Sequence, residues 1–264
     1  MTEIVRLAFG LMALVALVTP ASADKLDDIK ARGTLLVGVT ETSPPFSYRD
    51  PGRGIVGYDV DLAAAIAEKL GVRMERVVIL NKQRISVLKD DKADLVATGM
   101  TRSAARMKEI GFSLATLDSP HKVLIRRDSG LGMIGDLANR TLALVASASV
   151  DDDLKRAVPT LKIVFFDHYQ GAFDALTERR VDSFLADELL LLSFAQNSGM
   201  PADFALLTGY ELPRTAGFGI KQGETRLTEI VNRTLLELEA SGTAAKVFDA
   251  HFAPLPRRFK LAGD

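Results

Sequence analysis

Residues 85–98 read ISVLKDDKADLVAT, a pattern that predicts a helix, a charged turn and a short strand in succession. Residues 173–186 read FDALTERRVDSFLA, and the two stretches align without a gap and share two identical residues. Strand-like and helix-like segments alternate along nearly the whole chain, which is typical of α/β proteins with mostly parallel sheets. We therefore expect an α/β fold that contains two units of similar design.

The same alternation defines the remaining elements. The two prolines of the segment 43–46 exclude a helix and predict a loop at the end of the first strand. Asp59 or Asp61 is expected at the N-terminus of the next helix. We expect helices at 25–32, 57–70, 151–157, 169–179, 188–196 and within the last 40 residues, and strands at 34–40, 72–80, 93–97, 141–145, 162–166 and 181–186.

The first 23 residues have the pattern of a cleavable export signal. An apolar run at 7–18 follows Arg6 and precedes Ala21-Ser22-Ala23, a small-residue cleavage pattern. The run is shorter than the roughly 20 apolar residues that span a bilayer. We therefore expect an exported mature chain that begins at Asp24. Because the chain has no cysteine, it cannot be a lipoprotein or contain a disulfide.

Composition excludes several classes of function. The net charge is −1 with 25% charged residues, so no basic field indicates nucleic-acid binding. The chain has no tryptophan and no long basic amphipathic helix, which argues against a membrane-surface protein. The three histidines are far apart in sequence, so we expect no metal site, and no motif predicts a cofactor.

Residues 98–106 read TGMTRSAAR and supply the first candidate binding site. The stretch follows a predicted strand, and Arg106 can fold back over the strand end. Hydroxyl, backbone N–H and guanidinium groups together suit a small carboxylate. The alignment makes Gly99 and Asp187 equivalent positions, each just past a strand, where ligands of open α/β sheets bind. Two such sheets facing each other would place Asp187 across a cleft from Arg106.

The chain resembles the periplasmic amino-acid-binding proteins of ABC importers (solute-binding proteins of family 3). The resemblance rests on motifs found in order along the whole mature chain, and within the family it is closest to the glutamate/aspartate binders. It implies two α/β lobes of the periplasmic binding protein type II fold, joined by two strands and closing by hinge motion. We expect a discontinuous first lobe at 24–118 and 215–264 and a second lobe at 119–214. The motifs are GVTETSPPFSY (38–48), VGYDVDL (56–62), QRI (83–85), GMTRSAAR (99–106), IGFS (110–113), DH (167–168) and EASGT (239–243).

The resemblance also implies roles for individual residues. Arg106 matches the arginine that binds the ligand's α-carboxylate, Thr101 the hydroxyl beside it, and Gly99 a position that offers backbone. Asp187 matches the acid that binds the ligand's ammonium, although an aspartate before a helix is by default an N-cap. Phe46 matches an aromatic wall of the pocket, with core packing as the alternative.

Specificity is expected from residues where the chain departs from its relatives. Thr40 stands where acidic-ligand relatives carry arginine and basic-ligand relatives aspartate. Arg84 and His168 follow the acidic-binder pattern, and Asn81 replaces a serine. Ser149, in a Ser-Ala-Ser segment where the family has Gly-Thr-Thr, either contacts the carboxylate or caps a helix. The first expectation is a dicarboxylic amino acid, and the second is a neutral polar one such as glutamine or asparagine.

These expectations describe a monomeric receptor that binds a small-molecule amino acid and delivers it to the inner-membrane permease of an ABC importer. One alternative is an enzyme similar to the periplasmic cyclohexadienyl dehydratases, which would need a protonatable cleft carboxyl. The other is a sensory receptor that reports its ligand state to a membrane partner. Turnover of prephenate would distinguish the enzyme, and measured uptake would distinguish import from sensing.

Overall fold

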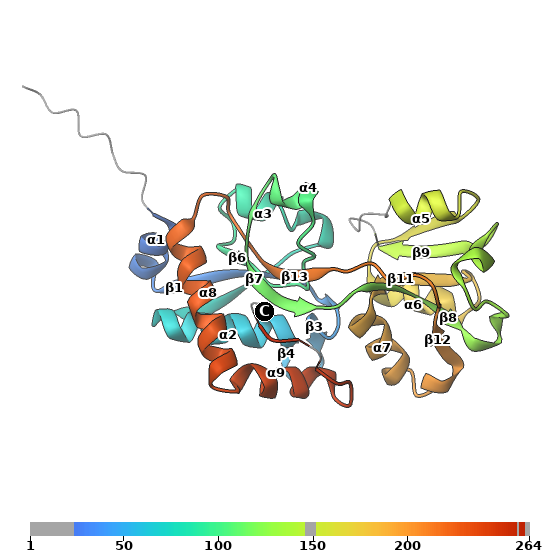
Figure 1. The fold of residues 1–264 in the computed structure, drawn as a ribbon. Coiled ribbons are helices and arrows are strands. Elements are labelled where there is room, and N and C mark those ends of the chain that lie inside the picture. Colours follow the sequence, from blue (N-terminus) through green and yellow to red (C-terminus); the bar gives the residue numbers. More distant parts are fainter. Residues whose placement is uncertain (1–23, 146–151, 258, 262–264) are drawn as a thin grey trace, which may run out of the picture.

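A computed structural model describes residues 24–145, 152–257 and 259–261. The chain forms two lobes that lie side by side and are linked by two extended segments (Figure 1). The predicted signal at residues 1–23 lies outside the described residues. No helix among the described residues is both long and apolar enough to cross a membrane.

Lobe I is built on a five-stranded sheet. The strand β13 is antiparallel to both of its neighbours, and the other four strands run in one direction. The order across the sheet is β5 (Arg73–Val78), β1 (Thr34–Val39), β6 (Leu95–Val96), β13 (Thr215–Ile220) and β7 (Gly111–Asp118).

Lobe II repeats this plan. Here β8 is the strand that runs against the other four. The order is β10 (Lys162–Phe166), β9 (Thr141–Val145), β11 (Ser183–Asp187), β8 (His121–Arg126) and β12 (Phe204–Leu206). The two aligned stretches therefore end in β6 and β11, which occupy the same third place in their sheets. The predicted fold class is confirmed.

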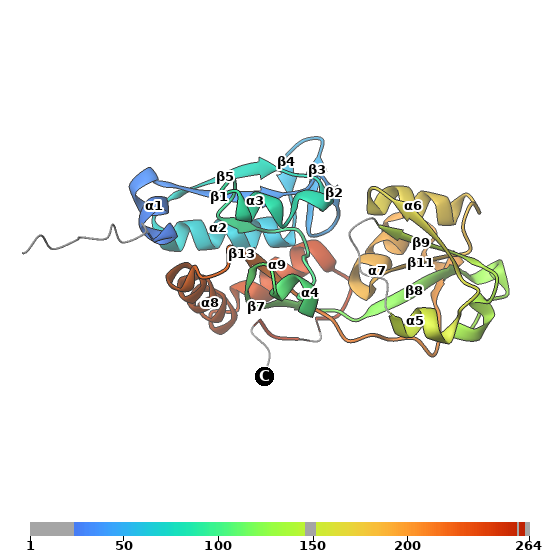
Figure 2. The same ribbon diagram turned by 90° about the horizontal axis from the view of Figure 1, so that it is seen from above.

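Helices cover the sheets of both lobes (Figures 1 and 2). The C-terminal helices α8 and α9 pack on lobe I, where the rings of Phe248 and Phe252 contact Tyr58. The helices are α1 (Lys25–Arg32), α2 (Tyr58–Leu70), α3 (Ser86–Lys89), α4 (Ala104–Met107), α5 (Asp152–Ala157), α6 (Tyr169–Thr177), α7 (Glu188–Asn197), α8 (Thr225–Ala240) and α9 (Thr243–Phe252).

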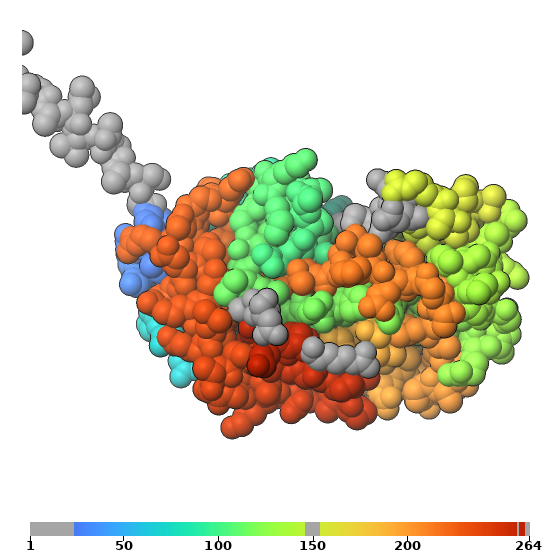
Figure 3. All heavy atoms as spheres, viewed as in Figure 1, coloured from blue at the N-terminus to red at the C-terminus, as the bar shows by residue number. Residues whose placement is uncertain are grey.

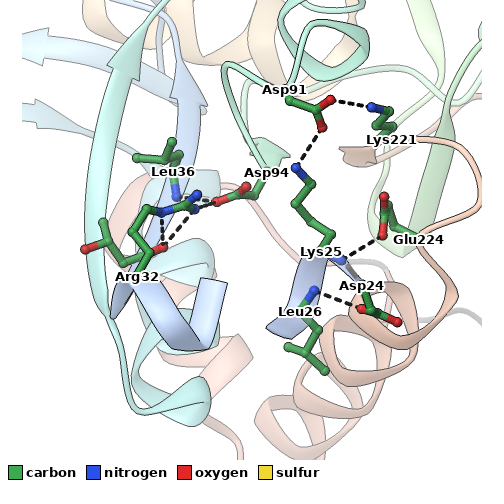
Figure 4. Close-up of polar contacts among 10 residues, drawn as sticks. Asp24, Lys25, Leu26, Arg32, Leu36, Asp91, Asp94, Lys221 and Glu224 are labelled. Atoms are coloured by element: carbon green, nitrogen blue, oxygen red, sulfur yellow. Dashed lines mark hydrogen bonds and ion pairs between the residues drawn. The ribbon is translucent and has the colours of Figure 1, made fainter. Parts of the chain in front are cut away.

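The two aligned stretches share an aspartate, Asp94 in lobe I and Asp182 in lobe II, that makes a similar hydrogen bond in each lobe. Asp94 accepts a hydrogen bond from the N–H of Leu36 in β1 at 2.8 Å and forms an ion pair with Arg32 (Figure 4). Asp182 likewise accepts the N–H of Thr141 in β9 at 2.8 Å. Each aspartate thus ties its turn to the strand in the second place of its own sheet. Figure 4 also shows α1 held by Lys25, which pairs with Asp91 at 2.7 Å.

Gly57 occupies the N-cap position of α2, and Asp59 and Asp61 lie in the first turn of this helix, as expected. One feature of lobe I was not predicted. The segments on both sides of the proline loop form a small antiparallel sheet, which was missed because its three strands are only two to four residues long. They are β2 (Thr42–Ser43), β3 (Ser47–Asp50) and β4 (Gly54–Val56).

Two chain crossings join the lobes, one from β7 to β8 and the other from β12 to β13. They lie side by side, because Ser119 donates its N–H to Arg214 O at 3.1 Å and His121 exchanges both backbone hydrogen bonds with Leu212 at 2.8 and 3.1 Å. Figure 3 shows the green and orange segments of these crossings over the junction of the lobes. A paired two-strand connection is suited to hinge motion.

Candidate functional site

A small cavity lies between the lobes at the ends of the two equivalent strands. Lobe I contributes residues from the segments after β5 and β6, and lobe II contributes residues from β8, α6 and β11. Both strand ends that the sequence singled out therefore face the same space. The lining residues are Arg84, Thr101, Arg106, His121, Tyr169, Leu185, Ala186 and Asp187.

The chain after β6 presents two lobe I lining residues, Thr101 and Arg106. Thr101 forms an isolated antiparallel bridge with Ala216, which fixes the segment against the second crossing. Arg106 lies in α4 and donates from Nη1 to the carbonyl of Thr101 at 2.9 Å. Burial, together with the nearby Arg84 guanidinium, lowers the pKa of Arg106. The guanidinium stays charged at physiological pH.

A buried carboxylate supports this segment from below. Asp59 is 1% exposed and accepts the N–H of Gly99 at 2.5 Å. Because Asp59 occupies this N–H group, the backbone donor expected at Gly99 is not available to a ligand. Burial raises the pKa of Asp59 to about 7, while the Gly99 N–H and the charge of Arg84 act in the opposite direction.

Arg84 is the second cation of the cavity. It is 4% exposed, and its Nη2 donates to the carbonyl of Thr98 at 3.2 Å. Its Nε atom has no hydrogen-bond partner among the described residues. Because Arg84 lines the cavity, its guanidinium places a second positive charge beside any ligand there.

Asp187 supplies the carboxylate of lobe II. It stands at the N-cap position of α7 but makes no side-chain capping bond, so the default role of an aspartate there is not used. Its side chain is 8% exposed, and Oδ1 lies 3.5 Å from His121 Nε2. The carboxylate faces the cavity instead.

Two further predicted residues lie in a neighbouring cavity between the lobes, which β5 and the segment before α6 help to line. Asn81 donates from Nδ2 across the cleft to the carbonyl of Asp167 at 3.4 Å. The Asn81 Oδ1 atom has no partner among the described residues. His168 caps α6, since its Nδ1 accepts the N–H of Gly171 at 3.0 Å.

The structure places the other predicted residues outside both cavities or outside the described residues. Phe46 is 1% exposed and its ring lies 5.8 Å from that of Phe252, so it packs in the core and is not a cavity wall. Thr40 is 1% exposed, and its hydroxyl donates to Ser43 Oγ at 3.0 Å, so its side chain is turned to a neighbouring loop. Ser149 lies outside the described residues.

Four lining residues were not predicted, namely His121, Tyr169, Leu185 and Ala186. The first two carry polar side chains. His121 reaches the cavity because it pairs with Asp187 across β8 and β11. Tyr169 begins α6, next to the histidine that was considered. Only the topology reveals the first, whereas the position beside His168 could have indicated the second. The described residues contain no group of three or more histidine, cysteine or acidic residues that could hold a metal ion.

Comparisons with known proteins agree with this geometry. A glutamine-binding protein of Geobacillus stearothermophilus is 30% identical over 183 residues, covering 67% of this chain and 70% of that protein. The glutamate/aspartate import solute-binding protein of Escherichia coli (strain K12) is 23% identical over 249 residues, covering 90% and 82%. A mutant of ArgBP from T. maritima has a TM-score of 0.78 and 31% identity, covering 87% and 99%. The family match spans residues 35–254, and the chain therefore belongs to the bacterial extracellular solute-binding proteins of family 3.

Proposed function

We propose that this protein is a periplasmic receptor that binds an L-amino acid between its lobes and delivers it to an ABC importer. The observation that carries the proposal is the pair of opposite charges at equivalent strand ends, Arg106 from lobe I and Asp187 from lobe II. An amino acid has a carboxylate and an ammonium on one carbon, so a single ligand can satisfy both groups. Closure of the lobes around it would give the permease a defined surface to bind.

An acidic amino acid suits the charges of the cavity best. Its lining contains two arginines and one carboxylate. Arg106 and Asp187 would bind the α-carboxylate and the ammonium, which leaves Arg84, with its unpartnered Nε, for a second carboxylate. Glutamate or aspartate is therefore the first candidate. Glutamine is the second, because the unpartnered Oδ1 of Asn81 in the neighbouring cavity could accept a side-chain amide.

A thermal-shift screen against the twenty amino acids tests this proposal. A bound ligand stabilises the folded protein by RT ln(1 + [L]/Kd), so a ligand present at about 100 times its Kd adds about 2.7 kcal/mol. Isothermal titration with L-glutamate and L-glutamine then separates the two candidates. No shift with any amino acid would contradict the proposed class of ligand, and tighter binding of glutamine would reverse the order of candidates.

We further propose binding without turnover. An enzyme that expels a leaving group would need an acidic proton in the cavity, and Asp187 is the carboxyl side chain among the lining residues. We assign this carboxyl to the ligand's ammonium, which leaves no other carboxyl among the lining residues to act as the acid. Incubation with prephenate should therefore leave the compound unchanged, and a product detected by absorbance would identify the enzyme instead.

A further inference from the structure

The hinge segment Ser119–Lys122 contacts the first turn of α7 at several points. The N–H of Glu188 donates to Pro120 O at 2.8 Å, and the N–H of Leu189 donates to Ser119 Oγ at 3.1 Å. Lys122 Nζ lies 3.3 Å from Glu188 Oε1. The first crossing between the lobes is thus bonded to the start of the helix that comes after Asp187.

The second of these bonds replaces a bond that an N-cap residue normally makes. An aspartate at the N-cap accepts the N–H of the second or third helical residue. In α7 the second helical residue is Leu189, and its N–H is already held by the hydroxyl of Ser119, which is 2% exposed. The N–H of the first helical residue is held by Pro120. Asp187 therefore stands at the N-cap with the donors of the first two helical residues already used.

His121 completes the arrangement from the same segment. It pairs with Asp187 across the two strands, and its Nε2 lies 3.5 Å from the Asp187 carboxylate. Both side chains are 8% exposed, and both line the cavity. The imidazole therefore occupies one flank of the carboxylate and limits the directions in which it can turn.

We propose that Ser119 and His121 are positioning residues for the ammonium-binding carboxylate: Ser119 caps α7 in place of Asp187, and His121 keeps the released carboxylate directed into the cavity. This inference rests on the proposed function of Asp187. Without the Ser119 hydroxyl, Asp187 is the nearest acceptor for the Leu189 N–H and would turn away from the ligand to cap the helix. The first crossing between the lobes would then affect ligand binding through the orientation of the Asp187 carboxylate.

The Ser119→Ala variant tests this role with two pairs of probes. L-glutamate is compared with glutarate, and L-glutamine with glutaramate, because each second compound lacks only the α-amino group. We expect Ser119→Ala to weaken amino-acid binding by about tenfold, the loss of one charge-assisted hydrogen bond, and to change binding of the analogues by less than about twofold. His121→Leu should also weaken binding of the amino acids more than binding of the analogues, but by less than Ser119→Ala does.

Three controls separate the possible causes. The measured ratio is the affinity for the amino acid divided by the affinity for its analogue without the α-amino group. Asp187→Ala gives the full contribution of the carboxylate to this ratio, and adding Ser119→Ala to Asp187→Ala should not change the ratio further. Ser113→Ala is the matched control, because Ser113 Oγ accepts the Phe218 N–H at 2.9 Å in lobe I and lies outside the cavity lining. We expect it to lower thermal stability without changing that ratio.

The outcomes distinguish this inference from the proposed function. If Asp187→Ala lowers the ratio but Ser119→Ala weakens both compounds of a pair equally, Ser119 is only structural and the positioning role is wrong. If Asp187→Ala leaves the ratio unchanged, Asp187 does not bind the ammonium, and this part of the proposed function fails together with the inference.

Discussion

The segments that follow β6 and β11 begin at equivalent places in two similar sheets, but they present opposite charges. In lobe I the chain passes through a left-handed glycine, Gly99, and a bridge to the second crossing before α4 presents Arg106. In lobe II the chain enters α7 directly, and Asp187 is the junction residue. The same sheet plan therefore presents a cation, Arg106, in lobe I and an anion, Asp187, in lobe II. The difference in charge therefore comes from the segment after each strand, whereas the two strands occupy the same place in their sheets.

The most damaging change to this pair of strand ends is Arg106→Ala. It would leave the α-carboxylate of a bound amino acid buried without its cation, so we expect a loss of on the order of 3 kcal/mol in binding free energy. Isothermal titration with L-glutamate measures it directly. A loss of less than about threefold in Kd would show that lobe I does not bind the carboxylate through this residue.

The next largest effect is expected from Asp59, the buried carboxylate of lobe I that accepts the Gly99 N–H. Burial raises the pKa of Asp59 from its ordinary 3.8 to about 7, so between these values the folded protein binds more protons than the unfolded chain. This contribution to stability is fully present below about pH 4 and is lost as the pH rises through about 7. We expect wild type to lose on the order of 2 kcal/mol relative to Asp59→Asn between pH 5 and 8.

Urea unfolding of the two ligand-free proteins at pH 5, 6, 7 and 8 measures this difference. Asparagine is the matched replacement, because it keeps the shape of the neutral acid and can still accept the Gly99 N–H. The charges near Asp59 are Arg84, Asp187 and His251. A stability difference that stays constant with pH would show that Asp59 remains ionised in the folded protein.

The sequence predicted the fold class and four of the eight lining residues, namely Arg84, Thr101, Arg106 and Asp187. Arg106 and Asp187 follow strand ends, which the alternation of apolar segments places without knowledge of the tertiary packing, whereas Thr101 and Arg84 were indicated by the family resemblance. Phe46 and Thr40 lie outside the cavity lining, because the direction of their side chains depends on α9 and β3, which pack against them from distant or weakly patterned segments. His121 was missed because only the pairing of β8 with β11 brings it beside Asp187.

Gly99 offers the sharpest test of why lobe I carries no side chain at the position equivalent to Asp187. Its φ is +63°, and a Cβ atom there would lie 2.6 Å from Cδ2 of Phe46. We expect Gly99→Ser to lower the free energy of unfolding by about 2 kcal/mol, from backbone strain and crowding of the Phe46 ring. Chemical denaturation without ligand measures the loss.

Gly33 separates the two causes. Its φ is +68°, almost the same, but a Cβ there would meet no atom within 4 Å, so Gly33→Ser carries the backbone cost alone, about 1 kcal/mol. The excess loss in Gly99→Ser then measures the contact with Phe46. If that contact is the cause, combining Gly99→Ser with Phe46→Leu should cost less than the sum of the two single changes. Additive losses would mean that the backbone alone excludes a side chain here, and that the core of lobe I does not determine which groups its strand end presents.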